Sequence, residues 1–281
     1  MTQYPNVPAN GTQRTPVRFL KAHACGNDFL VVERPCDPEL AKRLCARNTG
    51  VGADGVEFLE WTGKLSGAIR LANADGSIAE ISGNGTRCVA AWMAHTAKAE
   101  AGDVLTIETD AGVRECRIVS AAQSRFEIAT GMGIPAVRPD QVTLADGTDV
   151  AGTVVSMGNP HFVILVDEES FAAHGRSWQE LGQEICFHPQ FPEQTNVEFV
   201  RVIGTNEIEI RIFERGVGPT TSSGTGTCAC SAAVIARYGA EPHLLVSAPG
   251  GAQRVEWAGG TAEMTLTGPA ELIATGEAFG G

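Results

Sequence analysis

Two serines stand where they could take part in chemistry on a small anion. Ser82 and Ser223 each come directly before a Gly-x-Gly-Thr sequence, and each leads into an apolar segment rich in alanine. Such a segment predicts a helix, and the free N–H groups and positive dipole end at its start attract an anion. Two such helix ends facing one cleft could bind a single carboxylate from both sides.

Both serines belong to a longer repeat. Residues 69–86 read IRLANADGSIAEISGNGT and residues 210–227 read IRIFERGVGPTTSSGTGT, displaced by 141 positions without a gap. The sequence GNDF precedes the first copy, and GNPHF precedes the second. A period of about half the chain predicts two similar halves that face each other, and it argues against a solenoid of short repeats.

A simpler interpretation is that Ser82 and Ser223 only cap their helices, because serine is a favoured N-cap residue. A single Ser-Gly-x-Gly sequence would favour capping alone. The gapless pair makes a shared binding site the better hypothesis.

The hydrophobic pattern predicts the elements that position these serines. Segments 86–98 and 227–238 are apolar nearly all round, as enclosed helices are, and Gly239 is expected to end the second. The Gly-rich residues before them are expected to form turns. Shorter helices are predicted at 37–47 and 178–186. Strands are predicted at 105–110, 113–120, 126–129, 154–157, 162–167, 196–202, 207–213, 244–247, 253–257 and 261–266. This pattern favours sheets that curl around a central helix.

Composition limits the classes of partner. The net charge of −12 argues against nucleic acid and anionic membranes, and no apolar run has the length of a membrane span. The eight cysteines form no CxxC pair and are expected to be reduced thiols, so we predict no metal site. Residues 1–16 are polar and Pro-rich and are expected to be a disordered extension without the features of a signal sequence.

Six blocks of the sequence resemble the diaminopimelate epimerases. They follow the family's order and spacing and read KAHACGNDF, NTGVGADGV, NADGSIAEISGNGTRC, SMGNPHF, LGQEICFHPQFPEQTNVEFV and ERGVGPTTSSGTGTCA. The resemblance covers the chain from Val17 to its C-terminus. It implies an α+β fold of two pseudo-symmetric halves, each a mixed, mostly antiparallel sheet curled into a barrel around a central helix. We expect the first half at 17–130, the second at 131–268, and a return of 269–281 to the first half.

The same resemblance implies an activity. The family inverts one α-carbon of diaminopimelate, interconverting the L,L and meso forms for lysine and peptidoglycan synthesis. It uses no cofactor, usually works as a homodimer and is cytoplasmic. These properties are expectations for this chain.

The two catalytic positions depart from the family pattern. The family uses a thiolate and a thiol on opposite faces of the α-carbon, and those positions are Ser82 and Ser223 here. If a hydroxyl lies some five pKa units above a thiol, forming the anionic base costs roughly 7 kcal/mol more. Helix dipoles return only about 0.3–2 kcal/mol each, so a serine needs another group to take its proton.

Several residues could assist or disturb these serines. His161 is a candidate base, although an orienting or structural role is the alternative for a histidine in the family's ordinary GNPH sequence. Cys25 is a second candidate, at a position where the family carries an apolar residue. Cys88 and Cys228 lie well inside the predicted helices and cannot simply replace the lost thiols. Pro219 replaces a typical glutamate and stiffens the loop before Ser223.

The substrate contacts of the family match this sequence. Arginine binds a carboxylate with two donors and glutamate accepts from an ammonium, which suits a zwitterion. Taken singly, each asparagine is more simply a turn residue, but the ordered set favours binding. The matching side chains are Asn27, Asn73, Asn159, Asn196, Glu214 and Arg215, and the matching backbone N–H groups are at Gly83, Asn84, Gly224 and Thr225.

Three hypotheses remain open. The first is a diaminopimelate epimerase, with activity impaired by the paired serines. The second is a sibling isomerase or dehydratase on the same scaffold. The third is a non-catalytic protein that binds an amino acid. The retained contacts favour the first for ligand identity, and the serines favour the third for rate.

Overall fold

The computed structural model describes residues 15–279. The expected disordered extension, residues 1–16, lies outside this range except for its last two residues. Regular structure begins with β1 (Val17–Ala24).

The first half is a closed barrel of eight strands. β1 pairs with β2, and the pairing continues in order through β3, β4, β6, β7, β8 and β17, which pairs with β1 again. A short strand, β5, is added to β4. The bounds are β2 Asn27–Val32, β3 Gly55–Gly63, β4 Ser66–Asn73, β5 Ile78–Ala79, β6 Val104–Thr109, β7 Gly112–Ala122, β8 Arg125–Gly133 and β17 Met264–Ala278.

The second half repeats this order of pairing. The strands pair in the order β9, β10, β11, β12, β13, β15, β16 and β17, with β14 added to β13. Only four pairs in the described chain are parallel, namely β2–β3, β4–β6, β11–β12 and β13–β15, so the expected mixed, mostly antiparallel sheet is confirmed. The bounds are β9 Ala136–Thr143, β10 Asp149–Ser156, β11 Pro160–Leu165, β12 Asn196–Gly204, β13 Glu207–Glu214, β14 Gly218–Thr220, β15 His243–Ala248 and β16 Gly251–Glu256.

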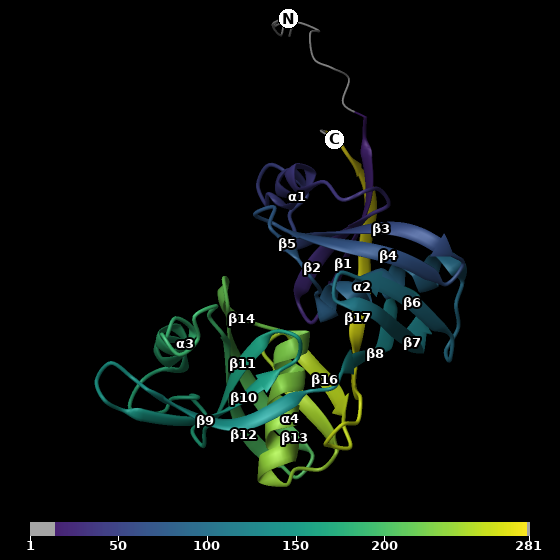
Figure 1. Ribbon diagram of the computed structural model, residues 1–281. Helices are drawn as coiled ribbons and strands as arrows, with labels where there is room; N and C mark the ends of the chain where they lie inside the picture. Colours follow the sequence, from purple (N-terminus) through teal and green to yellow (C-terminus); the bar gives the residue numbers. More distant parts are fainter. Residues whose placement is uncertain (1–14, 280–281) are drawn as a thin grey trace, which may run out of the picture.

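β17 joins the two halves. Residues 265–267 pair with β16, residues 264–271 pair with β8, and residues 271–278 pair with β1. Figure 1 shows this strand in yellow, running from the lower half into the upper one. β17 therefore completes the first barrel.

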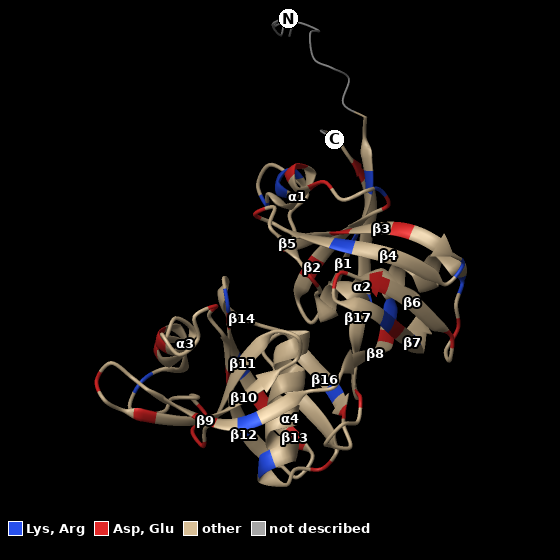
Figure 2. Cartoon of the chain, viewed as in Figure 1, with Lys and Arg blue, Asp and Glu red and all other residues tan. Residues whose placement is uncertain are grey.

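Each half encloses one helix, as predicted. α2 (Gly83–Ala97) and α4 (Gly224–Tyr238) are buried along most of their length in two separate hydrophobic clusters. Small side chains such as Ala90 and Ala233 let the strands approach closely. Figure 2 shows α4 almost free of charge, with blue only near its end, where Arg237 lies. Gly239, in the left-handed region with φ 72°, ends α4 as expected.

The two shorter helices pack outside the central ones. α1 (Pro38–Cys45) starts at the N-cap Asp37, and α3 (Trp178–Cys186) starts at Ser177, which forms a capping box with Glu180. α1 contacts β3 and β4, and α3 contacts β12 and β13. Both helices lie within the ranges predicted from sequence.

One sequence-based expectation was wrong in detail, and one strand was not predicted. The Gly-rich residues after each serine are not turns, because they form the first turn of α2 and of α4. Glycine is unfavourable inside a helix by about 1 kcal/mol relative to alanine, and packing against the first turn overrides that preference here. Strand β9 was not predicted, since residues 136–143 contain Pro139 and few apolar positions.

A methyl group added at Gly182 tests how tightly α3 packs on the second sheet. A β-carbon there would lie 2.7 Å from Phe213 Cβ. Alanine gains about 1 kcal/mol in helix propensity, but overpacking costs about 1–3 kcal/mol. We expect Gly182→Ala to lower the free energy of unfolding in urea denaturation. Gly204→Ala is the control, because its methyl would meet no atom within 4 Å; a stabilised Gly182→Ala variant would contradict this packing.

Candidate functional site

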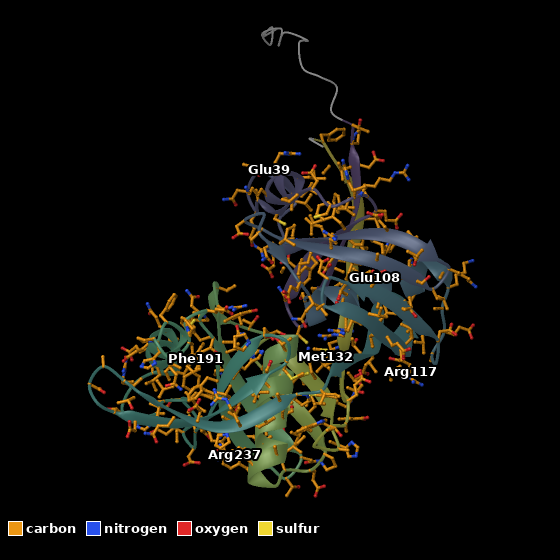
Figure 3. The ribbon with its side chains drawn as sticks, in the orientation of Figure 1. Glu39, Glu108, Arg117, Met132, Phe191 and Arg237 are labelled. Carbon is orange, nitrogen blue, oxygen red and sulfur yellow. The ribbon has the colours of Figure 1, made fainter. Side chains whose placement is uncertain are left out.

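The N-termini of α2 and α4 meet where the two halves join. A β-carbon on Gly83 would lie 3.5 Å from Gly224 Cα, and one on Gly224 would lie 3.3 Å from Gly83 Cα. Met132, labelled in Figure 3 between the halves, approaches the same β-position of Gly83 to 3.6 Å. The repeat therefore brings its two Ser-Gly-x-Gly segments to one place.

Both serines cap their helices. Ser82 Oγ accepts a hydrogen bond from Gly85 N–H at 3.1 Å, and Ser223 Oγ accepts one from Gly226 N–H at 3.1 Å. The capping interpretation is confirmed, and it does not compete with binding. Because the first N–H groups of a helix have no partner within it, those of Gly83, Asn84, Gly224 and Thr225 stay available to an anion.

Asn84 ties the first helix end to the second half. Its side-chain amide donates to Ser222 Oγ at 3.2 Å and to Asn27 Oδ1 at 3.3 Å. Its oxygen accepts from Arg87 Nη2 at 2.5 Å and from Gln253 Nε2 at 3.4 Å. Arg87 is fully buried and also donates to the carbonyls of Gly83 and Pro269. This network fixes the start of α2 against β16 and β17.

An ion-paired cluster holds Asn27 in place. Asn27 Nδ2 donates to Asp54 Oδ2 at 2.6 Å, and Arg47 Nη2 bonds to Asp54 and Asp28 at 2.7 and 2.9 Å. Burial would raise the pKa of Asp28, but its bonds to Arg47 and Lys21 outweigh burial and lower it. The cluster fixes the start of β2 beside the first turn of α2, where Asn27 accepts from Asn84.

A second network surrounds the start of α4. His161 is fully buried between Glu198, at 2.7 Å from Nδ1, and Asn159 Oδ1, at 3.0 Å from Nε2. Asn159 Nδ2 donates to Thr225 Oγ1 at 3.4 Å, which lies 3.5 Å from Ser223 Oγ. Within residues 15–279 no hydrogen bond joins His161 directly to Ser223, so its influence on that serine passes through Asn159 and Thr225.

The residues expected to bind a zwitterion lie beside this network. Asn196 donates to the carbonyl of Pro160 at 2.9 Å and accepts from the N–H of Arg215 at 2.9 Å. Burial raises the pKa of Glu214 to about 7, with the charge of Glu198 adding to the rise. Glu214 thus changes charge near neutrality, where it can accept from an ammonium group when ionised.

Asn73 is held differently. Its amide donates to Ser77 Oγ at 3.0 Å within its own turn, which matches the turn interpretation. Its role in binding stays a prediction.

The cysteines are free thiols, and all except the half-buried Cys36 are buried. Burial raises the pKa of Cys88 and raises that of Cys228 to about 12, so neither supplies a thiolate near neutrality. Cys25 lies in the left-handed region with φ 52°, and its sulfur accepts from Gln253 Nε2 at 3.5 Å. Cys25 therefore lies beside the Asn84 network, and its auxiliary role stays a prediction.

Sequence reasoning missed two buried glutamates, Glu57 and Glu198. Both are fully buried, and each lies against a helix start: a β-carbon on Gly85 would overlap Glu57 Oε1, and one on Gly226 would lie 2.9 Å from Glu198 Oε1. Their signal was the repeated Val-Glu-Phe at 56–58 and 197–199, also 141 positions apart. An acidic residue inside an apolar strand is unusual unless it has a role.

A hollow on the first half lies away from these residues. It has a volume of about 760 Å³ and is lined by β1, β2, β17 and Trp92, with none of the expected site residues. We place the candidate site at the starts of α2 and α4, where free N–H groups and the buried side chains of Glu57, Arg87, His161 and Glu198 converge.

Residues 15–279 contain no cluster of three or more His, Cys, Asp or Glu side chains suited to a metal ion. None of their helices has both the length and the apolar character needed to cross a membrane.

Comparisons with known proteins agree on one family. The family model described as diaminopimelate epimerase matches residues 19–137 and 153–273. The chain is 36% identical over 284 residues to a diaminopimelate epimerase of Acaryochloris marina, covering 92% of this chain and 98% of that one. It is 38% identical over 285 residues to one of Synechococcus sp. (strain JA-3-3Ab), covering 92% and 96%.

Solved structures share the fold at low sequence identity. A hydroxyproline epimerase from Agrobacterium vitis with bound trans-4-hydroxy-L-proline superposes with a TM-score of 0.68 at 16% identity, covering 95% of this chain and 93% of that one. A predicted epimerase from Pseudomonas aeruginosa gives a TM-score of 0.71 at 15% identity, covering 93% and 98%. These likenesses establish the architecture of two similar halves.

The burial of Glu57 predicts a dependence of stability on pH. Burial raises its pKa to about 8, so between about pH 4.3 and 8 the folded protein holds a proton that the unfolded chain has released. This carboxyl therefore lowers stability as pH rises. We expect Glu57→Gln to gain stability relative to the unchanged protein by at least about 1 kcal/mol more at pH 8 than at pH 5.

Urea denaturation at both pH values measures this difference. Glu60→Gln, an exposed glutamate on the same strand, is the control and should show no such change with pH. Equal effects of Glu57→Gln at pH 5 and pH 8 would contradict a protonated, buried carboxyl.

Proposed function

Because the chain belongs to the diaminopimelate epimerase family, we propose that it is a cofactor-independent isomerase that interconverts L,L- and meso-diaminopimelate. The observation that carries this proposal is the meeting of two pseudo-symmetric helix starts at Gly83 and Gly224, each preceded by a serine. A planar carbanion between them could lose a proton to one side and receive one from the other.

The surroundings suit the reacting end of an amino acid. The free N–H groups at Gly83, Asn84, Gly224 and Thr225 are placed to bind an α-carboxylate from both helices and to stabilise the charge that develops when the α-proton leaves. Glu214 and Arg215 provide partners for an ammonium and a carboxylate. In this proposal Asn27, Asn73, Asn159 and Asn196 contribute further polar contacts to the substrate.

Ser82 and Ser223 would be the groups that exchange the proton. An unassisted serine is a weak base, which favours a non-catalytic binding protein as the alternative. The fold is also shared with epimerases of other amino acids, so a sibling isomerase remains the second alternative. We further propose that the protein works as a homodimer in the cytoplasm and serves lysine biosynthesis, as the family resemblance implies.

Proton exchange in heavy water tests this function. With L,L- or meso-diaminopimelate we expect loss of the α-proton and appearance of the other epimer by NMR, with a low rate. Ser82→Cys together with Ser223→Cys should raise the rate at least tenfold, because a thiol loses its proton far more readily than a hydroxyl. Ser82→Ala and Ser223→Ala should each abolish inversion, since inversion needs both sides.

Titration calorimetry with the same ligands separates the alternatives. Binding without exchange in both the serine and the cysteine proteins would indicate a non-catalytic binding protein. An absence of binding in every form would exclude diaminopimelate as the ligand and direct the search to other amino acids.

A further inference from the structure

Glu57 is a buried carboxyl that nothing in the described chain satisfies. Its side chain is 0% exposed, and neither carboxylate oxygen forms a hydrogen bond with any other residue of the range 15–279. A buried polar group without a partner costs free energy and calls for an explanation. Glu57 lies against the first turn of α2, at Gly85.

Ser82 and Glu57 approach the same point of the first turn of α2. A β-carbon on Gly85 would overlap Glu57 Oε1 and would lie 3.2 Å from Ser82 Cβ. Ser82 Oγ accepts from Gly85 N–H, and no residue between 15 and 279 accepts the hydrogen of this hydroxyl. The Ser82 hydroxyl, which has no acceptor among these residues, and the Glu57 carboxylate, which has no donor, therefore both lie beside Gly85.

The second half shows what this carboxyl position can do when it has a partner. Glu198 occupies the equivalent place beside Gly226, whose β-position lies 3.3 Å from Ser223 Oγ. There Glu198 bonds to His161, which is opposite Asn196 in the strand register. Phe29 holds the corresponding register position opposite Gly55, so no imidazole reaches Glu57. Of the two repeated carboxyls, only Glu57 is left without a side-chain partner.

We propose that Glu57 accepts the hydroxyl proton of Ser82 while Ser82 Oγ takes the α-proton of the substrate, so that serine and carboxylate together act as one base. This proposal rests on the proposed epimerase function. Glu57 acts through Ser82 and does not itself contact the substrate. The role explains why a carboxyl is kept dry and unpaired behind this serine.

The proton transfer balances without a further reactant. The α-carbon keeps the electron pair of its broken C–H bond, and Ser82 Oγ forms a new O–H bond as its former proton moves to a Glu57 carboxylate oxygen. Ser82 ends as a neutral hydroxyl and Glu57 as a carboxylic acid. Ser223 then gives its hydroxyl proton to the carbanion from the opposite face, and Thr225 Oγ1, 3.5 Å from Ser223 Oγ, is placed to donate to the oxygen left behind. When the product leaves, solvent returns a proton to Ser223 and takes the proton from Glu57.

The basicity of Glu57 fits the task. Burial raises the pKa of Glu57 to about 8, close to the ordinary value of about 8.5 for a cysteine thiol. A serine that passes its proton to Glu57 therefore needs no alkoxide, and the pair offers a base of nearly the strength that a thiolate would supply. The buried carboxyl therefore offsets part of the basicity that is lost when serine replaces cysteine at position 82.

A double-substitution experiment on α-proton exchange tests this role. In the unchanged background we expect Glu57→Gln to lower exchange at least 100-fold. In the Ser82→Cys background the same change should alter exchange by less than threefold, because a thiolate is its own base. Glu60→Gln, on the exposed part of β3, is the control and should leave both backgrounds unchanged.

The stereochemistry of exchange separates this role from a structural one. Ser82 removes the α-proton from only one of the two epimers, so Glu57→Gln should suppress exchange of that epimer while exchange without inversion continues from the other. An equal loss for both epimers, or an equal loss in the serine and cysteine backgrounds, would show that Glu57 only supports the fold. No loss would overturn the proposal outright.

Failure of the proposal can be distinguished from failure of the proposed function. If the unchanged protein shows no exchange but the paired cysteine variant does, the epimerase scaffold stands and the serine–carboxylate base is overturned. If neither exchanges and neither binds diaminopimelate, the function itself fails.

Discussion

The contact between Gly83 and Gly224 is the constraint on which the site depends. The two helix starts come so close that a β-carbon on Gly224 would lie 3.3 Å from Gly83 Cα, which is tighter than most such contacts. Each barrel encloses one helix, β17 is shared between the barrels, and Asn84 bonds across the junction to Ser222. These features hold the two positive helix ends together against their mutual repulsion, and an anion at the junction would relieve that repulsion.

Sequence predicted those features that local patterns encode. The enclosed helices, the capping serines and most strands follow from apolar periodicity and from the repeat. The start of α2 was misplaced because Gly-Asn-Gly resembles a turn, while the structure uses Gly85 inside the helix to admit the Glu57 carboxyl. That reason involves a residue 28 positions away. Helix propensity reflects only residues that are close in sequence, so it cannot predict this contact.

The sequence predicted which residues belong to the candidate site, but it did not predict how their side chains contact one another. Resemblance named Asn159, Asn196 and Arg215, yet only the fold shows that Asn159 joins His161 to Thr225, and that Asn196 fixes the backbone of Arg215. Sequence gave no reason to join Glu198 to His161, because their contact arises from the register of two parallel strands. Pairing between distant strands is set by the whole barrel, so these bonds could not be derived from spacing.

The two halves have a similar backbone fold, but their buried carboxyls, Glu57 and Glu198, differ in their hydrogen-bond partners. Glu198 is hydrogen-bonded to His161, whereas Glu57, whose pKa burial raises to about 8, has no partner among the residues described. An unpaired buried carboxyl lowers stability at neutral pH, and such a cost persists in proteins mainly where activity depends on it. An inversion reaction needs an acid on one face and a base on the other at the same moment. Unequal carboxyls behind two equivalent serines provide that difference without breaking the symmetry of the helix ends that bind the carboxylate.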